Sequence, residues 1–305
     1  MSFSSEIKQE LCSLPLENTC CQRAELAGLL ALSGTLISES EGGGLRLRTE
    51  NAHVAKRAFT LLSGLFSVHP KRMAVEKKNE GYIHTIHLYE HDNFVPIMKT
   101  LGFWRDGRVK FSADPFVTGE SCCRRAFLRG AFLGAGSASA PQKSYHLEIE
   151  THYRDLAQDL LHLFEDEQLS ARSVVRKSNY VIYMKDSEEI ADTLTALGAT
   201  DSALNLYHVK IEKDMKNQVN RRVNCETANL TKIANSAALQ IQAIKKVMSA
   251  TIAADLSEEL IELAKLRIEN PEASLIELAS MLNEPISKSG VSRRLQKLIK
   301  MAEEL

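Results

Sequence analysis

The sequence contains no apolar stretch of about 18 or more residues, and its first residues, MSFSSEIKQELCSLP, include neither a basic segment nor an apolar one. A secretory signal requires both, in that order. We therefore expect a soluble, cytoplasmic protein with no membrane partner. The chain also has almost no net charge, because its basic and acidic side chains sum to −1. The net charge therefore does not indicate a particular class of partner.

A C-x-x-C motif is absent as well. The cysteines form two adjacent pairs and two single positions, namely Cys20-Cys21, Cys122-Cys123, Cys12 and Cys225. Zinc sites usually present two thiolates separated by two or more residues, and adjacent cysteines lack that separation. The pattern predicts buried, reduced thiols and no metal.

Three histidines occur close together in GYIHTIHLYEH, at His84, His87 and His91. This stretch has the pattern of a strand, in which His84 and His87 point to opposite faces and cannot share an ion. No metal and no cofactor is predicted, and no catalytic triad can be argued from spacing, because the fold assembles such triads.

The first two-thirds of the chain repeats one pattern. CCQRAELAGLLALSG begins at Cys20 and CCRRAFLRGAFLGAGS begins at Cys122, an offset of 102 residues. Each segment precedes two short strands, the second ending near Glu50 or Glu150, then a helix with paired leucines, a hairpin and a helix ending in Leu-Gly. This self-similarity indicates an internal duplication.

The repeated segment resembles the LAGLIDADG motif of homing endonucleases, as LAGLLALSG from Leu26 and LRGAFLGAG from Leu128. The resemblance implies two motif helices packed side by side and twin αββαββ halves that form a saddle over DNA. Small residues at helical spacing are expected to let the helices approach closely, at Gly28, Ala31, Gly34, Gly130 and Gly134. Gly130, Gly134, Gly136 and Ser137 could instead cradle a phosphate, but the following lysine and preceding apolar strand of a P-loop are missing.

The two motif copies lack the acidic residues that the endonucleases use. The eighth motif position, which holds divalent metal in that family, is Ser33 in one copy and Ala135 in the other, and the sixth position is Ala31 or Leu133. Hard cations such as Mg²⁺ need oxygen ligands, usually carboxylates, and two-metal cleavage depends on their charge. We expect no nuclease activity and no metal at this degenerate motif.

Basic residues gather after the duplication. Residues 201–222 read as a helix in which basic side chains outnumber acidic ones, and a further helical stretch runs from Ala228 to Met248. The basic side chains are Lys210, Lys213, Lys216, Arg221 and Arg222. An ordinary solvated helix face is the favoured explanation, and Arg221 and Arg222 are candidate contacts to phosphate.

The last fifty residues have the pattern of a helix-turn-helix domain. A one-faced apolar helix from Leu256 to Ile268 ends at Asn270-Pro271, and a second helix starts at Ser274, where Ser274 and Glu277 have capping-box spacing. After a turn at residues 283–285, a third helix begins around Ser287, with an inner face of Val291, Leu295, Leu298 and Ile299. Its start is marked by a hydrophobic staple between Ile286 and Val291.

The outer face of this third helix is basic and rich in hydrogen-bond donors. We predict that it contacts DNA through Lys288, Ser289, Ser292, Arg293, Arg294, Gln296, Lys297 and Lys300. A recognition helix of this kind enters the major groove and contacts base edges and phosphates. The alternative is a solvated helix of a three-helix bundle, but charge sign, turn chemistry and helix spacing all favour DNA binding.

Together the two parts resemble the WhiA family, the sporulation and cell-division regulators of Gram-positive bacteria. The likeness includes the segment RRVNCETANL from Arg221 to Leu230, similar to the R-x-N-C-E-x-A-N signature of that family, and it covers nearly the whole chain. It implies a non-enzymatic DNA-binding protein that acts at promoters and influences cell division, chromosome segregation or sporulation. Arg129 and Leu133 depart from the motif by placing charge and bulk near the helix pair.

We therefore predict an α+β fold, with a duplicated αββαββ LAGLIDADG-like saddle followed by an all-α helix-turn-helix domain. The expected parts are an N-terminal extension (1–19), two repeats (20–112 and 113–205), a connector (206–228) and the DNA-binding domain (229–305). The predicted function is sequence-specific regulation of transcription by a nucleoid-associated protein bound to double-stranded DNA. The alternative is a nucleoid-associated or RNA-binding protein with little sequence specificity. The saddle could bind a protein partner, because Arg46 and Arg48 of the first repeat correspond to positions near Glu148 and Glu150 of the second.

Overall fold

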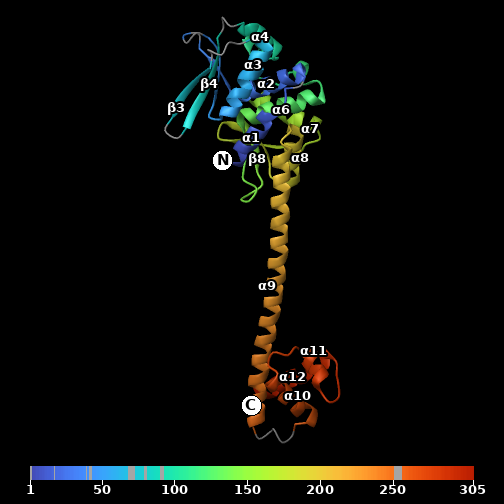
Figure 1. The fold of residues 1–305 in the computed structure, drawn as a ribbon. Helices are drawn as coiled ribbons and strands as arrows, with labels where there is room; N and C mark the ends of the chain where they lie inside the picture. The colour runs from blue at the N-terminus through green and yellow to red at the C-terminus, as the bar shows by residue number, and fades with distance from the viewer. Residues whose placement is uncertain are drawn as a thin grey trace. The chain divides into compact units, whose positions relative to one another are not determined.

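The computed structural model describes residues 2–16, 18–38, 40, 43–67, 73–78, 81–89, 93–250 and 256–305. The chain divides into two compact units, Met1–Lys213 and Asp214–Leu305, and the division falls within one helix (Figure 1). None of the described helices is both long enough and apolar enough to cross a bilayer. His91 lies outside the described residues.

The first unit contains two copies of one order of elements, which confirms the duplicated αββαββ arrangement. The first copy consists of α2 (Thr19–Ser33), β1 (Gly34–Ile37), β2 (Gly44–Thr49), α3 (Ala52–Phe66), β3 (Met73–Lys78), β4 (Gly81–Tyr89) and α4 (Phe94–Thr100). The second consists of α6 (Ser121–Ala135), β7 (Gly136–Ala138), β8 (Leu147–Thr151), α7 (Arg154–Asp166), β9 (Arg172–Arg176), β10 (Asn179–Met184) and α8 (Ser187–Leu197). The β5–β6 hairpin (Trp104–Arg105 and Arg108–Val109) and α5 (Pro115–Thr118) connect the copies.

Each copy forms one four-stranded antiparallel sheet, in the order β1-β2-β4-β3 or β7-β8-β10-β9. Side chains alternate between the two faces of a strand, so each sheet has one apolar, buried face. On that face Leu47 lies opposite Ile86 in the first sheet, and Ile149 lies opposite Ile182 in the second. The strands therefore occupy equivalent places in the two copies.

The motif helices α2 and α6 pack against each other at the centre of the first unit (Figure 1). Most of their apolar side chains are buried, among them those of Leu26, Leu29, Phe127 and Phe132. Both repeats thus share one hydrophobic core.

The residues that precede the first repeat form α1 (Phe3–Ser13), and this helix belongs to the same core. Phe3, Ile7 and Leu11 recur every four residues and are buried on one face. Glu10, on the same helix, accepts hydrogen bonds from the backbone nitrogens of Asp201 (2.7 Å) and Ser202 (3.0 Å). A carboxylate there satisfies unpaired N–H groups in the first turn of a later helix.

That later helix is α9 (Thr200–Ser249), in which the two helical stretches expected around the connector are continuous. Neither glycine nor proline occurs between its ends, so nothing interrupts the backbone hydrogen-bond ladder. The beginning of α9 buries Ala203 and Leu206 in the first core, and its end buries Ile244 and Val247 in the second. Residues 214–232 are exposed on every side of the helix.

The expectation of buried thiols is wrong for most of the cysteines. Cys122 and Cys225 are exposed, Cys12, Cys20 and Cys21 are half-buried, and Cys123 is buried. Moreover, the two adjacent pairs lie together, with the Sγ atoms of Cys20, Cys21, Cys122 and Cys123 all within 4.8 Å of one another. Each pair alone lacks the spacing for a shared ion, but the packing of α2 on α6 brings the two pairs into contact.

Candidate nucleic-acid interface

The second unit is a bundle of helices built around α12 (Lys288–Glu303). The last turns of α9 pack with α10 (Glu258–Glu269), α11 (Leu275–Met281) and α12 around one small core. Val291, Leu295 and Leu298 are buried in it, and Ile299 packs at its edge. The inner face predicted from the spacing is therefore confirmed, and the opposite face of α12 points away from the core.

Both predicted helix starts are confirmed at atomic detail. Ser274 Oγ accepts a hydrogen bond from the backbone nitrogen of Glu277 (3.3 Å), and the Glu277 carboxylate accepts one from the backbone nitrogen of Ser274 (2.7 Å). Hydrogen bonds from the backbone and the hydroxyl of Ser274 to the carboxylate hold the pKa of Glu277 below its ordinary value. Ser287 Oγ accepts from the backbone nitrogen of Gly290 (3.2 Å), which fixes the first turn of α12.

A buried arginine that the sequence reasoning missed closes the turn between α10 and α11. The side chain of Arg267 is 2% exposed, and its Nη1 donates a 2.7 Å hydrogen bond to the carbonyl oxygen of Ala273. Burial lowers the pKa of the guanidinium. The burial of Arg267 could have been predicted from the sequence, because position 267 falls four and seven residues after Leu263 and Leu260, on the buried face of the helix.

Six of the eight residues predicted to contact DNA are exposed to solvent. They are Lys288, Ser289, Arg293, Gln296, Lys297 and Lys300. Ser292 is half-buried, and so is Arg294, whose guanidinium donates to the carboxylate of Glu259 on α10. Arg294 therefore supports the packing of α12 on α10.

Four lysine and arginine side chains on the outer face of α12 make no hydrogen bond or ion pair with any described residue, namely Lys288, Arg293, Lys297 and Lys300. Uncompensated positive charge on a rigid helix attracts phosphate, and arginine can also contact the major-groove edge of guanine. This face therefore has the charge and the donors that a DNA duplex requires.

The two candidate phosphate contacts outside this domain lie on the exposed part of α9. Arg221 and Arg222 are both exposed, and Nε of Arg222 lies 3.0 Å from the carboxylate of Glu226, one turn further along the helix. Lys213, by contrast, donates to the carbonyl oxygen of Pro141 (2.6 Å). Lys213 therefore helps to hold α9 to the first unit, whereas Arg221 and Arg222 face solvent.

In the first unit, the glycines of the two motifs allow the backbones of α2 and α6 to touch. A Cβ atom added to Gly28 would lie 2.0 Å from the carbonyl oxygen of Phe127, and one added to Gly130 would lie 1.9 Å from that of Glu25. No side chain fits at those distances, which confirms their structural role. Gly34 differs from the prediction, because it lies at the end of α2 and a Cβ there would meet Leu30 of its own helix.

The degenerate motif positions lie at or near the carboxyl ends of α2 and α6. Ser33 Oγ donates a 2.6 Å hydrogen bond to the carbonyl oxygen of Leu29, so its hydroxyl is used within its own helix. Ala135 offers no ligand atom. Ala31 and Leu133 are buried apolar residues.

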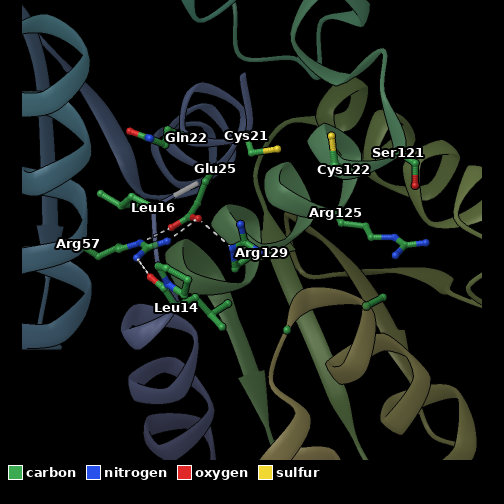
Figure 2. Close-up of a pocket in the computed structure, with 13 residues that line it drawn as sticks. Leu14, Leu16, Cys21, Gln22, Glu25, Arg57, Ser121, Cys122, Arg125 and Arg129 are labelled. Atoms are coloured by element: carbon green, nitrogen blue, oxygen red, sulfur yellow. Dashed lines mark hydrogen bonds and ion pairs between the residues drawn. The ribbon is translucent and has the colours of Figure 1, made fainter. Parts of the chain in front are cut away.

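One carboxylate of the helix pair is deeply buried, but arginines surround it. Glu25 accepts hydrogen bonds from Nε of Arg57 (2.6 Å) and Nε of Arg129 (2.9 Å), as Figure 2 shows. Arg57 also donates to the carbonyl oxygen of Leu14, and Arg129 to that of Leu197 (3.2 Å). Arg129, which differs from the motif, is thus paired with Glu25 of the other repeat.

The equivalent strands β2 and β8 carry opposite charges on the open faces of their sheets. Arg46 and Arg48 alternate with buried leucines on β2, whereas Glu148 and Glu150 alternate with buried apolar residues on β8. Glu148 lies 2.9 Å from Nε2 of His146. The contrast is confined to these two strands, because Arg176 of β9 lies on the same face of the second sheet, 3.5 Å from Glu148.

Comparisons with known proteins agree with this arrangement along the whole chain. Residues 19–103 match the model of the WhiA N-terminal LAGLIDADG-like domain, residues 124–216 the WhiA LAGLIDADG-like domain, and residues 219–302 the WhiA C-terminal HTH domain. The boundary between the second and third matches falls within α9.

Full-length relatives and one solved structure are similar to this chain. The "Probable cell division protein WhiA" of Alkaliphilus metalliredigens is 40% identical over 99% of this chain and 98% of its own length. The protein of that name from Clostridium novyi is 41% identical over 100% of this chain and 98% of its own. The crystal structure of full-length DUF199/WhiA from Thermatoga maritima covers 100% of this chain and 99% of its own, with 27% identity and a TM-score of 0.61.

Proposed function

This chain belongs to the WhiA family, and we propose that it is a non-enzymatic, sequence-specific DNA-binding regulator of transcription. Its proposed recognition helix is α12, which would enter the major groove with its outer face towards the bases. The partner is double-stranded DNA at promoters, and the protein would be cytoplasmic and nucleoid-associated.

The observation that carries the proposal is the exposed outer face of α12. Its basic side chains are held by a helix whose start is capped and whose inner face is buried, so they are presented on a rigid element. Arg293 and Lys297 lie one turn apart and can reach the same groove. Ser289, Ser292 and Gln296 supply further donors and acceptors for base edges and phosphates.

The absence of enzymatic activity is proposed from the degenerate motif. Where homing endonucleases carry metal-holding carboxylates, this chain has Ser33, whose hydroxyl is bonded to its own helix, and Ala135. The buried Glu25 is no substitute, because both of its carboxylate oxygens accept hydrogen bonds from arginines. Metal-assisted phosphodiester cleavage needs a site with carboxylates available to the ion.

We propose a role in cell division, since the relatives bear that name, and in chromosome segregation or sporulation, as the family resemblance implies. The duplicated LAGLIDADG-like part would then supply a binding surface in addition to the recognition helix. Its equivalent strands, with Arg46 and Arg48 on β2 and Glu148 and Glu150 on β8, do not form an evenly basic groove, and this suits a protein partner better than an evenly charged duplex.

The decisive measurement is a specificity ratio. Full-length protein is used to select binding sites from random DNA, and its affinity for the selected site is compared with that for a shuffled duplex at matched salt concentration. A specific regulator is expected to prefer its site by roughly 1,000-fold or more. Immunoprecipitation of the protein with chromosomal DNA should then recover the same sequence at promoters.

A ratio close to one would contradict the proposal. It would instead support a nucleoid-associated or RNA-binding protein that recognises the phosphate backbone, and competition with duplex DNA and with RNA would separate those two. Salt dependence alone does not decide, because both specific and non-specific binding release counterions.

A further inference from the structure

Four cysteines meet where the two motif helices begin. Each helix contributes an adjacent pair in its first turn, and equivalent positions of the two repeats supply equivalent thiols. We call the set the cysteine cluster: Cys20, Cys21, Cys122 and Cys123.

The distances in the cysteine cluster suit a common ion. All four Sγ atoms lie within 4.8 Å of one another, and those of Cys20 and Cys21 are 4.0 Å apart. A tetrahedral zinc ion with Zn–S bonds of about 2.3 Å places its sulfur ligands about 3.8 Å apart. Movements of about 1 Å or less would therefore convert the observed arrangement into a closed tetrahedron.

The helix ends add a second, independent feature. Neither Asn18 nor Glu120, the N-cap residues of α2 and α6, makes a side-chain hydrogen bond to the first turn. Backbone N–H groups of both turns are thus left for the sulfur atoms, and the positive ends of two helix dipoles meet at the cysteine cluster. Four thiolates around one Zn²⁺ carry a net charge of about −2, which such a setting stabilises.

An ion can also reach the position. A hollow of ≈ 390 Å³ lies between the two repeats, and Cys21 and Cys122 line it beside Glu25, Arg125 and Arg129 (Figure 2). Cys122 is exposed and Cys20 and Cys21 are half-buried. The cysteine cluster is therefore accessible from solvent, while its fourth thiol, from Cys123, is anchored in the core.

We propose that the cysteine cluster binds one Zn²⁺ ion as a tetrahedral tetrathiolate site that ties the two repeats together. All four thiols deprotonate on binding, and their protons pass to solvent or buffer; no electron is transferred. The site lies at the opposite end of α2 and α6 from Ser33 and Ala135, about 20 Å along the helices. It is thus a structural metal site unrelated to the metal position of homing endonucleases, and it does not depend on the proposed DNA binding.

Cobalt substitution tests the proposal on the full chain. Reduced protein, freed of metal by a chelator and kept without oxygen, is titrated with Co²⁺ while its visible and near-ultraviolet absorption is recorded. Tetrahedral thiolate ligation gives strong visible bands together with sulfur-to-cobalt charge transfer. We expect these bands to saturate at one Co²⁺ per chain and to disappear when one equivalent of Zn²⁺ is added, since zinc binds such sites more tightly.

Matched double variants assign the ligands. Cys20→Ser with Cys123→Ser removes one thiol from each pair and should abolish the tetrathiolate spectrum. Cys12→Ser with Cys225→Ser also removes two thiols, but outside the cysteine cluster, and should leave the spectrum and the stoichiometry unchanged. Circular dichroism checks that both variants are folded.

Two outcomes would overturn the proposal. One is reduced, folded wild-type protein that gives no tetrahedral thiolate bands at saturating Co²⁺, a result that needs no variant. The other is freshly isolated protein that holds less than one-tenth of an equivalent of zinc and whose intact mass shows the four thiols oxidised in pairs. That result would assign the cysteine cluster to disulfide chemistry instead.

Discussion

Glu25 in the first repeat accepts a hydrogen bond of 2.9 Å from Nε of Arg129 in the second, so an ion pair with a buried carboxylate links the two repeats. The pair has no counterpart, because the equivalent positions of the other copy are Phe127 and Ala27. The backbones around it are related symmetrically, with Gly28 against Phe127 and Gly130 against Glu25. The helix contact has therefore kept its two-fold backbone geometry, while its side chains have diverged.

Replacing Glu25 by alanine should destabilise the protein by about 3–5 kcal/mol, because Arg57 and Arg129 would be left partly buried without a counter-charge. Chemical denaturation of the two proteins measures the difference. Glu226→Ala is the control, since it removes an exposed partner of Arg222 and should cost no more than about 0.5 kcal/mol. Equal losses in the two variants would contradict a structural role for the buried pair.

Substituting Gly130 by alanine should cost about 1–3 kcal/mol or prevent folding, because the new Cβ would lie 1.9 Å from a backbone oxygen of α2. Gly64→Ala makes the same chemical change in α3, where no atom lies within 4 Å of the added Cβ. That variant should be stabilised by roughly 0.5–1 kcal/mol through helix propensity alone. Thermal melts of both variants beside the wild type give the comparison, and opposite signs are the expected result.

Arg293→Ala and Lys297→Ala should each weaken DNA binding, by about 1–3 kcal/mol where the side chain contacts a base edge and by less where it touches phosphate only. Lys265→Ala is the matched control, because it removes one exposed positive charge from α10. Gel shifts with the selected site at fixed salt measure the effect. If both α12 variants keep the affinity and the melting temperature of the wild type, the DNA-binding surface lies elsewhere on the protein.

Purified protein is expected to leave duplex DNA intact in the presence of Mg²⁺ or Mn²⁺, because Ser33 and Ala135 stand where carboxylates would hold the metal. Supercoiled plasmid is the substrate, since a single nick converts it to the relaxed form. The prediction that the protein is not a nuclease would be wrong if the plasmid is nicked in the presence of metal but not after a chelator is added. The nicking would also have to be lost in variants of residues 26–34.

The stability of the first unit should vary with pH through Lys8. Burial lowers the pKa of Lys8 from 10.5 to about 8, so below about pH 8 the folded protein holds a charge that it disfavours. In the unfolded chain Lys8 stays protonated up to about pH 10.5. The free-energy cost of burying Lys8 therefore decreases as the pH rises from 8 to 10.5. Lys8→Met should melt at a higher temperature than the wild type at about pH 7, with a smaller difference at about pH 10. A difference independent of pH would exclude titration as its cause.

Features that depend on local pattern could be predicted from the amino-acid sequence alone. Repetition at a fixed offset predicted the duplicated αββαββ order, and apolar spacing predicted the inner face of α12, because a helix repeats every 3.6 residues wherever it lies. The capping box of Ser274 and Glu277 was also readable, since its partners are three residues apart. The DNA-contacting roles of Arg293, Lys297 and their neighbours follow from the same local pattern and stay predictions.

Contacts between residues far apart in the sequence became apparent only in the folded protein. In the sequence Arg129 is only a departure from its motif, whereas in the fold it forms an ion pair with Glu25, 104 residues away. Two cysteine pairs that could not each hold an ion converge only because Gly28 and Gly130 let two helices touch. Local spacing fixes which way a side chain leaves its own helix, but it carries no information about which distant helix packs there. Contacts between the repeats, and the cysteine cluster with them, are therefore properties of the fold.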